Sequence, residues 1–198
     1  MNFPLPRLLL LLYLLLFTAC AISPYNRAVW WAENIPILLL VAVIAVASRF
    51  HRFSPLSWLF MSVLVALHTI GGHYTFERVP FGFVSELFGF TRNHYDRIAH
   101  FSVGFYALPI AEMVWSRRWV TSRVLVSIFA VSTILAVAAL YEIFEWRYAL
   151  LADPGAGIAV LGSQGDPWDA QKDMLADGLG ALFSITGFLL WSRRQTAS

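Results

Sequence analysis

Six apolar segments of helical length decide what this chain can fold into. Each approaches the roughly 20 residues that an α-helix needs to cross a bilayer, and each is bounded by polar residues or by Pro and Gly. The segments are runs of Leu, Val and Ala without the alternation of a membrane strand. We therefore expect an all-α, polytopic membrane helical bundle that forms one integral membrane domain over residues 1–198. The spans are expected at roughly 8–22, 31–47, 56–70, 98–115, 120–141 and 174–191.

The composition supports this interpretation and excludes several classes of protein. Hydrophobic residues make up 59% of the chain and charged residues only 13%, whereas a soluble domain usually carries about 25% charged residues. An ordinary soluble enzyme, a disordered chain and a nucleic-acid-binding protein with a basic face are therefore excluded. The single cysteine, Cys20, excludes an intramolecular disulfide and every cysteine-based zinc motif. The expected partner is the lipid bilayer, and the oligomeric state is left open.

The arginines of the short connections indicate how the chain crosses the membrane. Eight of them alternate onto one face, which the positive-inside rule assigns to the cytoplasm together with both termini. The opposite face holds eleven of the twelve carboxylates and two long connections, expected at 71–97 and 142–173. The eight arginines are Arg7, Arg49, Arg52, Arg117, Arg118, Arg123, Arg193 and Arg194.

The first apolar segment has an alternative interpretation as a cleaved signal peptide. Arg7 precedes a Leu-rich run that ends in small residues around Cys20, and this order is typical of secretory signals. The same run is long enough to extend towards a full span, which we favour. Cleavage would leave five spans and would not change the outer face.

Polar residues gather in four stretches near the outer ends of the spans. Asp96 and His100 are spaced i,i+4, and Glu142 and Glu145 are spaced i,i+3, so each pair shares one helix face. A helical bundle would bring the four stretches together in one cavity open to the outside. The stretches are 68–74 (HTIGGHY), 93–100 (NHYDRIAH), 141–146 (YEIFEW) and 162–177, in which Asp169, Asp173 and Asp177 form an i,i+4,i+8 stripe.

Ionisable groups within spans are costly and usually mark function, so these stretches supply the candidate site residues. Mixed histidine and carboxylate ligands suit zinc, manganese or iron, and we expect a divalent metal as the cofactor, if one is bound. The candidate metal ligands are His100, His68, Glu142 and Asp173. The candidate catalytic residues are Glu142, Asp177 and Asp96. The candidate binding residues are His68, His73, Tyr74, Arg97, Gln164, Asp166, Trp168 and Asp169.

A purely structural interpretation of the same residues stays open. Asp96 beside Arg97 and Glu145 near Arg147 can form interfacial ion pairs, and Asp169 can cap a helix N-terminus. At the inner face, Glu112 is expected to pair with Arg117 or Arg118. Small residues along the last span, Gly178 and Gly180 among them, favour close helix packing.

The four stretches carry a resemblance to a known family. The segments HTIGGHYTF, NHYDRIAHFSVGF, ALYEIFEW and LGSQGDPWDAQKDMLADGLGA resemble the YjdF-type inner-membrane proteins of bacteria, a family without an assigned function. The resemblance covers about residues 31–190 and implies a multi-pass bacterial inner-membrane protein. A fainter similarity to VanZ-like proteins pairs their motifs with Asp96-Arg97-x-x-His100, Glu142-x-x-Glu145 and Asp173-x-x-x-Asp177, and implies that these helices surround one site.

Three functions are compatible with the sequence. The first is a polar site, with or without a metal, that opens to the outer face and acts on a lipid or envelope precursor, as a metal-assisted hydrolase would. The second is a proton-coupled transporter in which Glu142 and Asp177 titrate, although the one-sided charge distribution disfavours a path across the membrane. The third is a membrane scaffold protein whose carboxylates only lock the helices together.

Overall fold

The computed structural model describes residues 4–195, and over this range the chain forms helices and no strand. In chain order the helices are α1 (Leu5–Ala21), α2 (Arg27–Phe50), α3 (Pro55–Tyr74), α4 (Gly82–Phe88), α5 (Tyr95–Val103), the 3-10 turn η1 (Gly104–Tyr106), α6 (Ala107–Ser116), α7 (Arg123–Leu151), α8 (Pro154–Leu161) and α9 (Asp169–Gln195).

Within the described residues, five helical segments are long and apolar enough to cross a membrane. They are α2, α3, the continuous segment Tyr95–Ser116, α7 and Asp169–Arg193, and the shorter α1 is an apolar helix of 17 residues. The expectation of a polytopic membrane helical bundle is therefore confirmed.

Local sequence signals begin these helices where the apolar runs start. The side chain of Asn26 accepts hydrogen bonds from the backbone N–H groups of the first turn of α2. Ser54 does the same for α3, with Pro55 directly after it, and Ser122 does so for α7. Each cap satisfies backbone donors that have no partner within the helix.

The expected connections at one end of the bundle are shorter than the sequence indicated. Helix α7 continues past residue 141 to Leu151, and α8 follows it, so much of 142–173 is helical. Helix α3 likewise continues to Tyr74, and α4 occupies part of 71–97. The helices are longer than the apolar runs because backbone hydrogen bonding persists into the polar turns that carry the candidate site residues.

The span that contains the candidate ligand His100 changes its helical winding at residues 104–106. There the α-helix tightens to a 3-10 turn before resuming as α6. Pro109 explains the irregularity, because its ring nitrogen cannot donate to the carbonyl of Phe105, four residues earlier, and its ring crowds that position.

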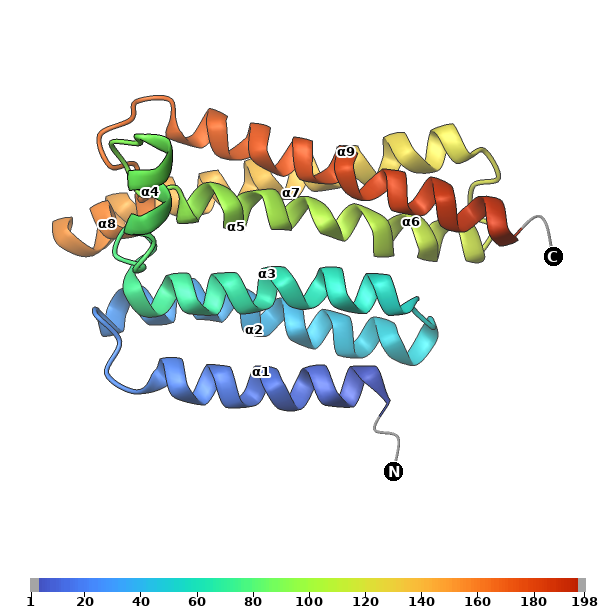
Figure 1. Ribbon diagram of the computed structural model, residues 1–198, viewed down its shortest axis with the longest axis horizontal. Helices are drawn as coiled ribbons and strands as arrows, with labels where there is room; N and C mark the ends of the chain where they lie inside the picture. Colours follow the sequence, from blue (N-terminus) through green and yellow to red (C-terminus); the bar gives the residue numbers. More distant parts are fainter. Residues whose placement is uncertain (1–3, 196–198) are drawn as a thin grey trace.

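The helices pack in two groups, which Figure 1 shows as two layers. Helices α1 and α2 pack on α3, while α5, α6 and α7 pack on or around α9. Helix α1 begins and helix α9 finishes on the same side of the bundle, which we call the terminal end (Figure 1). We call the opposite end the site end. The main core lies between α6, α7 and α9, with Ala107, Leu108, Ala111, Val114, Val126, Ala130, Ile134, Ala181, Ile185 and Phe188 buried together.

Two glycines allow α9 to touch the span that carries His100. A Cβ atom at Gly104 would collide with the backbone of Gly180 and Ala181, and one at Gly180 would collide with the carbonyl of Phe101. Only a residue without a Cβ fits at such a backbone contact. The close packing expected from the small residues of the last span is therefore present. It sets the spacing between the faces that carry the candidate site.

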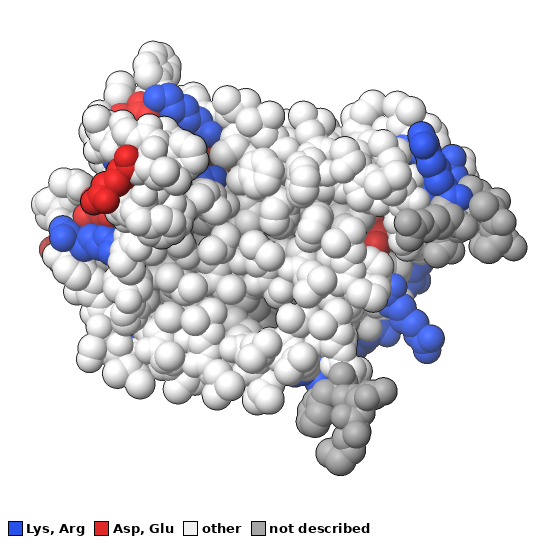
Figure 2. Space-filling view, in the orientation of Figure 1, with Lys and Arg blue, Asp and Glu red and all other residues white. Residues whose placement is uncertain are grey.

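The charges divide between the two ends as Figure 2 shows. On the face drawn there, acidic surface mixes with basic surface at the site end, and basic surface predominates at the terminal end.

Glu112 does not pair with Arg117 or Arg118 as the sequence suggested. It is buried, and its carboxylate accepts hydrogen bonds from the backbone N–H of Ser54 (3.1 Å), the Ser54 hydroxyl (2.5 Å) and the Ser57 hydroxyl (2.8 Å). Arg117 instead donates to the carbonyl of Phe50. The reason is that α6 packs beside the start of α3, where the serines supply donors inside the protein. Glu112 therefore joins the two helix layers.

Replacing this carboxylate tests its structural role. We expect Glu112→Ala to lower the free energy of unfolding by about 1–3 kcal/mol, because it leaves the buried donors of Ser54 and Ser57 without an acceptor. Thermal unfolding of the detergent-purified protein measures the change, with Glu86→Ala on the exposed side of α4 as the control. Equal unfolding temperatures for the two variants would contradict this role.

Candidate functional site

A buried cluster of one histidine and three aspartates lies where α5 meets α9. Asp96 and His100 come from α5, and Asp173 and Asp177 come from α9. The i,i+4 spacings place each pair on one helix face, and the close packing of the two helices turns the faces towards each other.

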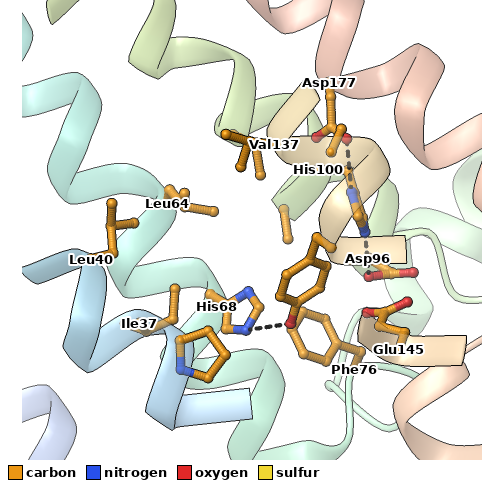
Figure 3. Close-up of a pocket in the computed structure, with 15 residues that line it drawn as sticks. Ile37, Leu40, Leu64, His68, Phe76, Asp96, His100, Val137, Glu145 and Asp177 are labelled. Carbon is orange, nitrogen blue, oxygen red and sulfur yellow. Dashed lines mark hydrogen bonds and ion pairs between the residues drawn. The ribbon is translucent and has the colours of Figure 1, made fainter. Parts of the chain in front are cut away.

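His100 uses its two ring nitrogens in different directions. Its Nε2 lies 3.7 Å from an oxygen of Asp96 and 3.7 Å from an oxygen of Asp173. Its Nδ1 lies 3.3 Å from Asp177 Oδ2, a contact that Figure 3 shows together with the one to Asp96. A possible metal-ligand atom from each of three residues, Asp96, His100 and Asp173, lies within 4.8 Å of the other two. Among the described residues, this is the group that could hold a metal ion. Asp177 lies on the opposite side of the imidazole ring, at Nδ1.

The burial of the cluster makes its polar atoms costly unless they have partners. Asp177 is 0% exposed, and its Oδ1 has no hydrogen-bond partner within residues 4–195. His100, Asp96 and Asp173 are also buried. The site is therefore built of polar groups that the surrounding hydrocarbon cannot solvate.

An ion-pair network closes the cluster on the side nearest the end of the bundle. Arg97 pairs with Asp173 and with Asp169 (2.5 Å), rather than with its neighbour Asp96. Arg92 also pairs with Asp169, at 2.7 Å. The network fixes the first turn of α9 against the start of α5, and so positions Asp173 beside His100.

The outermost part of this network is exposed. The ammonium group of Lys172 lies 2.6 Å from Asp166 and holds the pKa of that carboxyl below its usual range. The side chain of Gln164 exchanges two hydrogen bonds with the backbone of Asn93, at 2.9 and 3.0 Å. The loop before α9 is thereby fastened to the loop before α5.

A second polar group, formed by Glu33, His68 and Tyr141, lies across the same cavity. Glu33 Oε2 is 3.1 Å from His68 Nε2 and accepts a 2.9 Å hydrogen bond from the Tyr141 hydroxyl. His68 therefore faces Glu33 and lies outside the group around His100. Glu33 is not among the site residues predicted from the sequence, although a carboxylate within an apolar run is a signal for such a site.

A cavity of about 180 Å³ separates the two polar groups. His68, Asp96, His100, Tyr141, Glu145 and Asp177 line it on its polar sides, and aliphatic side chains such as Leu40, Leu64 and Val137 complete the wall (Figure 3). Glu145 is buried here, whereas Arg147 is exposed and lies over the ring of Trp146. The cavity therefore combines acidic groups with an apolar wall.

Some candidate residues do not line the cavity. His73 contacts the backbone carbonyl of Cys20 through Nδ1 at 2.8 Å, which joins α3 to the end of α1. Tyr74 stacks edge-on with His73 and is partly exposed, and Trp168 is 63% exposed. Glu142 is half-buried, and its buried Oε1 has no partner among the described residues. None of these four side chains is in direct contact with His100.

His94 lies just outside the spans. Burial and the nearby cations Arg92 and Arg97 lower the pKa of its imidazole. Its ring packs against that of Phe90 in a tilted arrangement, with 4.3 Å between the ring centroids.

Comparison with known proteins identifies the family. A family model described as a predicted membrane protein (DUF2238) matches residues 5–194, almost the whole chain. The chain belongs to this family. It is 35% identical over 189 residues to the inner membrane protein YjdF of Escherichia coli (strain K12), an alignment that covers 94% of this chain and 89% of the relative. No solved structure matches it.

The family membership confirms the resemblance to YjdF-type proteins. With five membrane-length helical segments within residues 4–195, the chain is a multi-pass protein of the bacterial inner membrane. The fainter VanZ-like similarity stays an expectation.

Proposed function

We propose that this family member binds a divalent metal ion through Asp96, His100 and Asp173. The observation that carries the proposal is the two-sided arrangement of His100. Nε2 faces two carboxylates, while Nδ1 faces a third, Asp177. A metal-bound histidine almost always donates its other N–H to a carboxylate or carbonyl, which fixes the tautomer and the ring orientation.

The charge balance of the site supports the same proposal. Three permanent cations, Arg92, Arg97 and Lys172, pair with the acidic residues of the site end. Eight carboxylates lie in or beside the cavity and the ion-pair network, so carboxylates outnumber these cations. The excess negative charge must be neutralised by bound protons or by a bound cation. The carboxylates are Glu33, Asp96, Glu142, Glu145, Asp166, Asp169, Asp173 and Asp177.

We propose zinc, manganese or iron as the ion, since one imidazole with carboxylates is a donor set that these metals accept. A metal in such a site polarises a bound oxygen and lowers the pKa of bound water. Glu142 supplies a carboxylate without a fixed partner and is our candidate for the group that takes up a proton. Metal-assisted hydrolysis of a lipid or envelope precursor is the reaction class that fits these parts.

We further propose that the site faces the periplasm. Arginines concentrate in the connections at the terminal end, and the positive-inside rule places such connections in the cytoplasm. The site end then meets the outer leaflet, where envelope lipids and their precursors are available.

Metal content tests the proposal. We expect the detergent-purified wild type to carry close to one equivalent of zinc, manganese or iron by elemental analysis, and His100→Ala to carry none. The matched control is His94→Ala, which removes an imidazole at the same end of the bundle but outside the cluster.

The same samples separate a metal site from a structural lock. A folded wild type that stays metal-free after equilibration with each of the three metals would refute the proposal. Equal metal loss in His94→Ala and His100→Ala would refute the assignment to this cluster. Size-exclusion chromatography shows whether each variant is folded, and Asp173→Asn serves as a second ligand variant if His100→Ala is not.

A further inference from the structure

A second, wholly apolar cavity of about 250 Å³ lies next to the site cavity. The two cavities share Leu40, Leu64, Val103 and Val137 in their walls. Figure 3 shows Leu40, Leu64 and Val137 on the side of the site cavity away from Asp96 and Glu145. Together the cavities reach the range of about 300–1,000 Å³ that is typical of ligand sites. A ligand with a polar end and an apolar end would match this pair of cavities.

The apolar cavity runs along the bundle towards the terminal end. Met113 lines its far part, while His100 lies in the site cavity, on the same span. At about 1.5 Å per residue these positions are about 20 Å apart. One leaflet of the hydrocarbon core is about 15 Å thick. The two cavities together therefore have the reach of one acyl chain.

The cavities open sideways between α2 and α7. Val137 on α7 lines both cavities and is still 49% exposed, and Val43 on α2 lines the second and is 63% exposed. Helix α2 packs on α3 and α8, and α7 packs on α6, α8 and α9, so the two helices make little contact with each other. Their hydrogen bond from Tyr141 to Glu33 lies beside the site cavity. Val43 and Val137 lie within the apolar spans α2 and α7, so their exposed sides belong to the surface that would meet the hydrocarbon region of a membrane.

We propose that an acyl chain of a membrane phospholipid enters between α2 and α7 and lies in the apolar cavity, with its phosphate at the His100 cluster. The proposal rests on the proposed function, because the metal is what binds the phosphate in an otherwise acidic site. The apolar cavity offers no polar partner to a water-soluble ligand, since the Tyr106 hydroxyl at its wall already donates to the Met61 carbonyl at 2.9 Å. The membrane presents acyl chains directly at the opening.

Photolabelling tests where the chain lies. The protein is reconstituted in phosphatidylethanolamine vesicles that contain phosphatidylglycerol with a diazirine on its acyl chain, and labelled residues are mapped by mass spectrometry. Leu64 is the reporter, because it lines both cavities and is only 5% exposed. Ile185, 6% exposed and buried in the core of α6, α7 and α9, is the background residue. We expect labelling of Leu64 and none of Ile185.

Two tryptophan variants of α7 provide the matched pair. Val137→Trp blocks the opening and is expected to abolish labelling of Leu64. Leu140→Trp adds the same ring at an outward position, 67% exposed, and is expected to leave the labelling unchanged. Leu40→Trp replaces Val137→Trp if that variant does not fold. The inference would be overturned if Leu64 were labelled no more than Ile185 in the wild type. It would also be overturned if Leu64 were labelled equally in Val137→Trp and Leu140→Trp.

Metal analysis of the same samples separates this inference from the proposed function. A protein with its metal but without labelling at Leu64 overturns the acyl-chain site alone. If the wild type contains no metal but Leu64 is still labelled, and Val137→Trp abolishes that labelling, the metal site and the phosphate contact are overturned. The same result supports entry of the acyl chain.

Discussion

Gly180→Ala is expected to destabilise the protein by more than about 3 kcal/mol, the upper end of the usual cost of overpacking. The added Cβ would collide with the backbone carbonyl of Phe101, which cannot move without shifting α5. Because His100 precedes Phe101 and Asp177 lies one turn before Gly180, the same shift separates the histidine from its aspartate. Folded yield in detergent, the thermal unfolding midpoint and metal content are the three measurements.

Gly178→Ala is the matched control on the same helix. Its Cβ would lie 3.2 Å from the terminal methyl group of Leu135, a flexible side chain that can adjust. Alanine also favours a helix over glycine by about 1 kcal/mol, so we expect this variant to be neutral or slightly more stable. Similar unfolding midpoints for the two variants would show that the α5–α9 backbone contact does not limit stability.

The second large effect is expected at Asp177, which we regard as a positioning residue. Asp177→Asn removes the charge that faces His100 Nδ1 but keeps the shape of the side chain. Loss of such a partner typically weakens metal binding by about 10–100-fold. We expect a weakening of this size in the metal dissociation constant, measured by competition with a chelator of known affinity.

Two comparisons make this prediction specific. Glu86→Gln alters an exposed carboxylate on α4, at the same end of the bundle and outside the cluster around His100, so its metal affinity should match the wild type. The metal-free unfolding midpoint of Asp177→Asn should also stay close to that of the wild type. An unchanged dissociation constant, or a fall in midpoint without a change in affinity, would assign Asp177 to folding alone.

Much of the His100 cluster follows from spacing within single helices. The i,i+4 pairs Asp96–His100 and Asp173–Asp177 lie on shared faces as a helix of 3.6 residues per turn requires. Both faces also belong to spans, where ionisable groups need partners. The sequence therefore predicts that these residues are functional candidates and that each pair acts together.

Periodicity within one helix does not predict which groups meet across helices. His68 was expected beside His100 as a ligand, but it pairs with Glu33, because α3 packs against α2 as well as α5. Glu33 itself was overlooked as a site residue. Glu112 was expected to pair with a nearby arginine, but the packing of α6 beside α3 brought Ser54 and Ser57 closer. In each case the partner comes from another helix and from a different part of the chain.

The sequence by itself determined that this protein is a helical membrane bundle, because apolar runs of this length must satisfy their backbone hydrogen bonds internally in lipid. It also determined the family, and which acidic residues share a helix face. Only the tertiary structure decided that His100 meets Asp177, 77 residues later in the chain. The physical reason is the backbone contact between Gly104 and Gly180, which sets how closely α5 and α9 approach and therefore which side chains lie within reach of the imidazole.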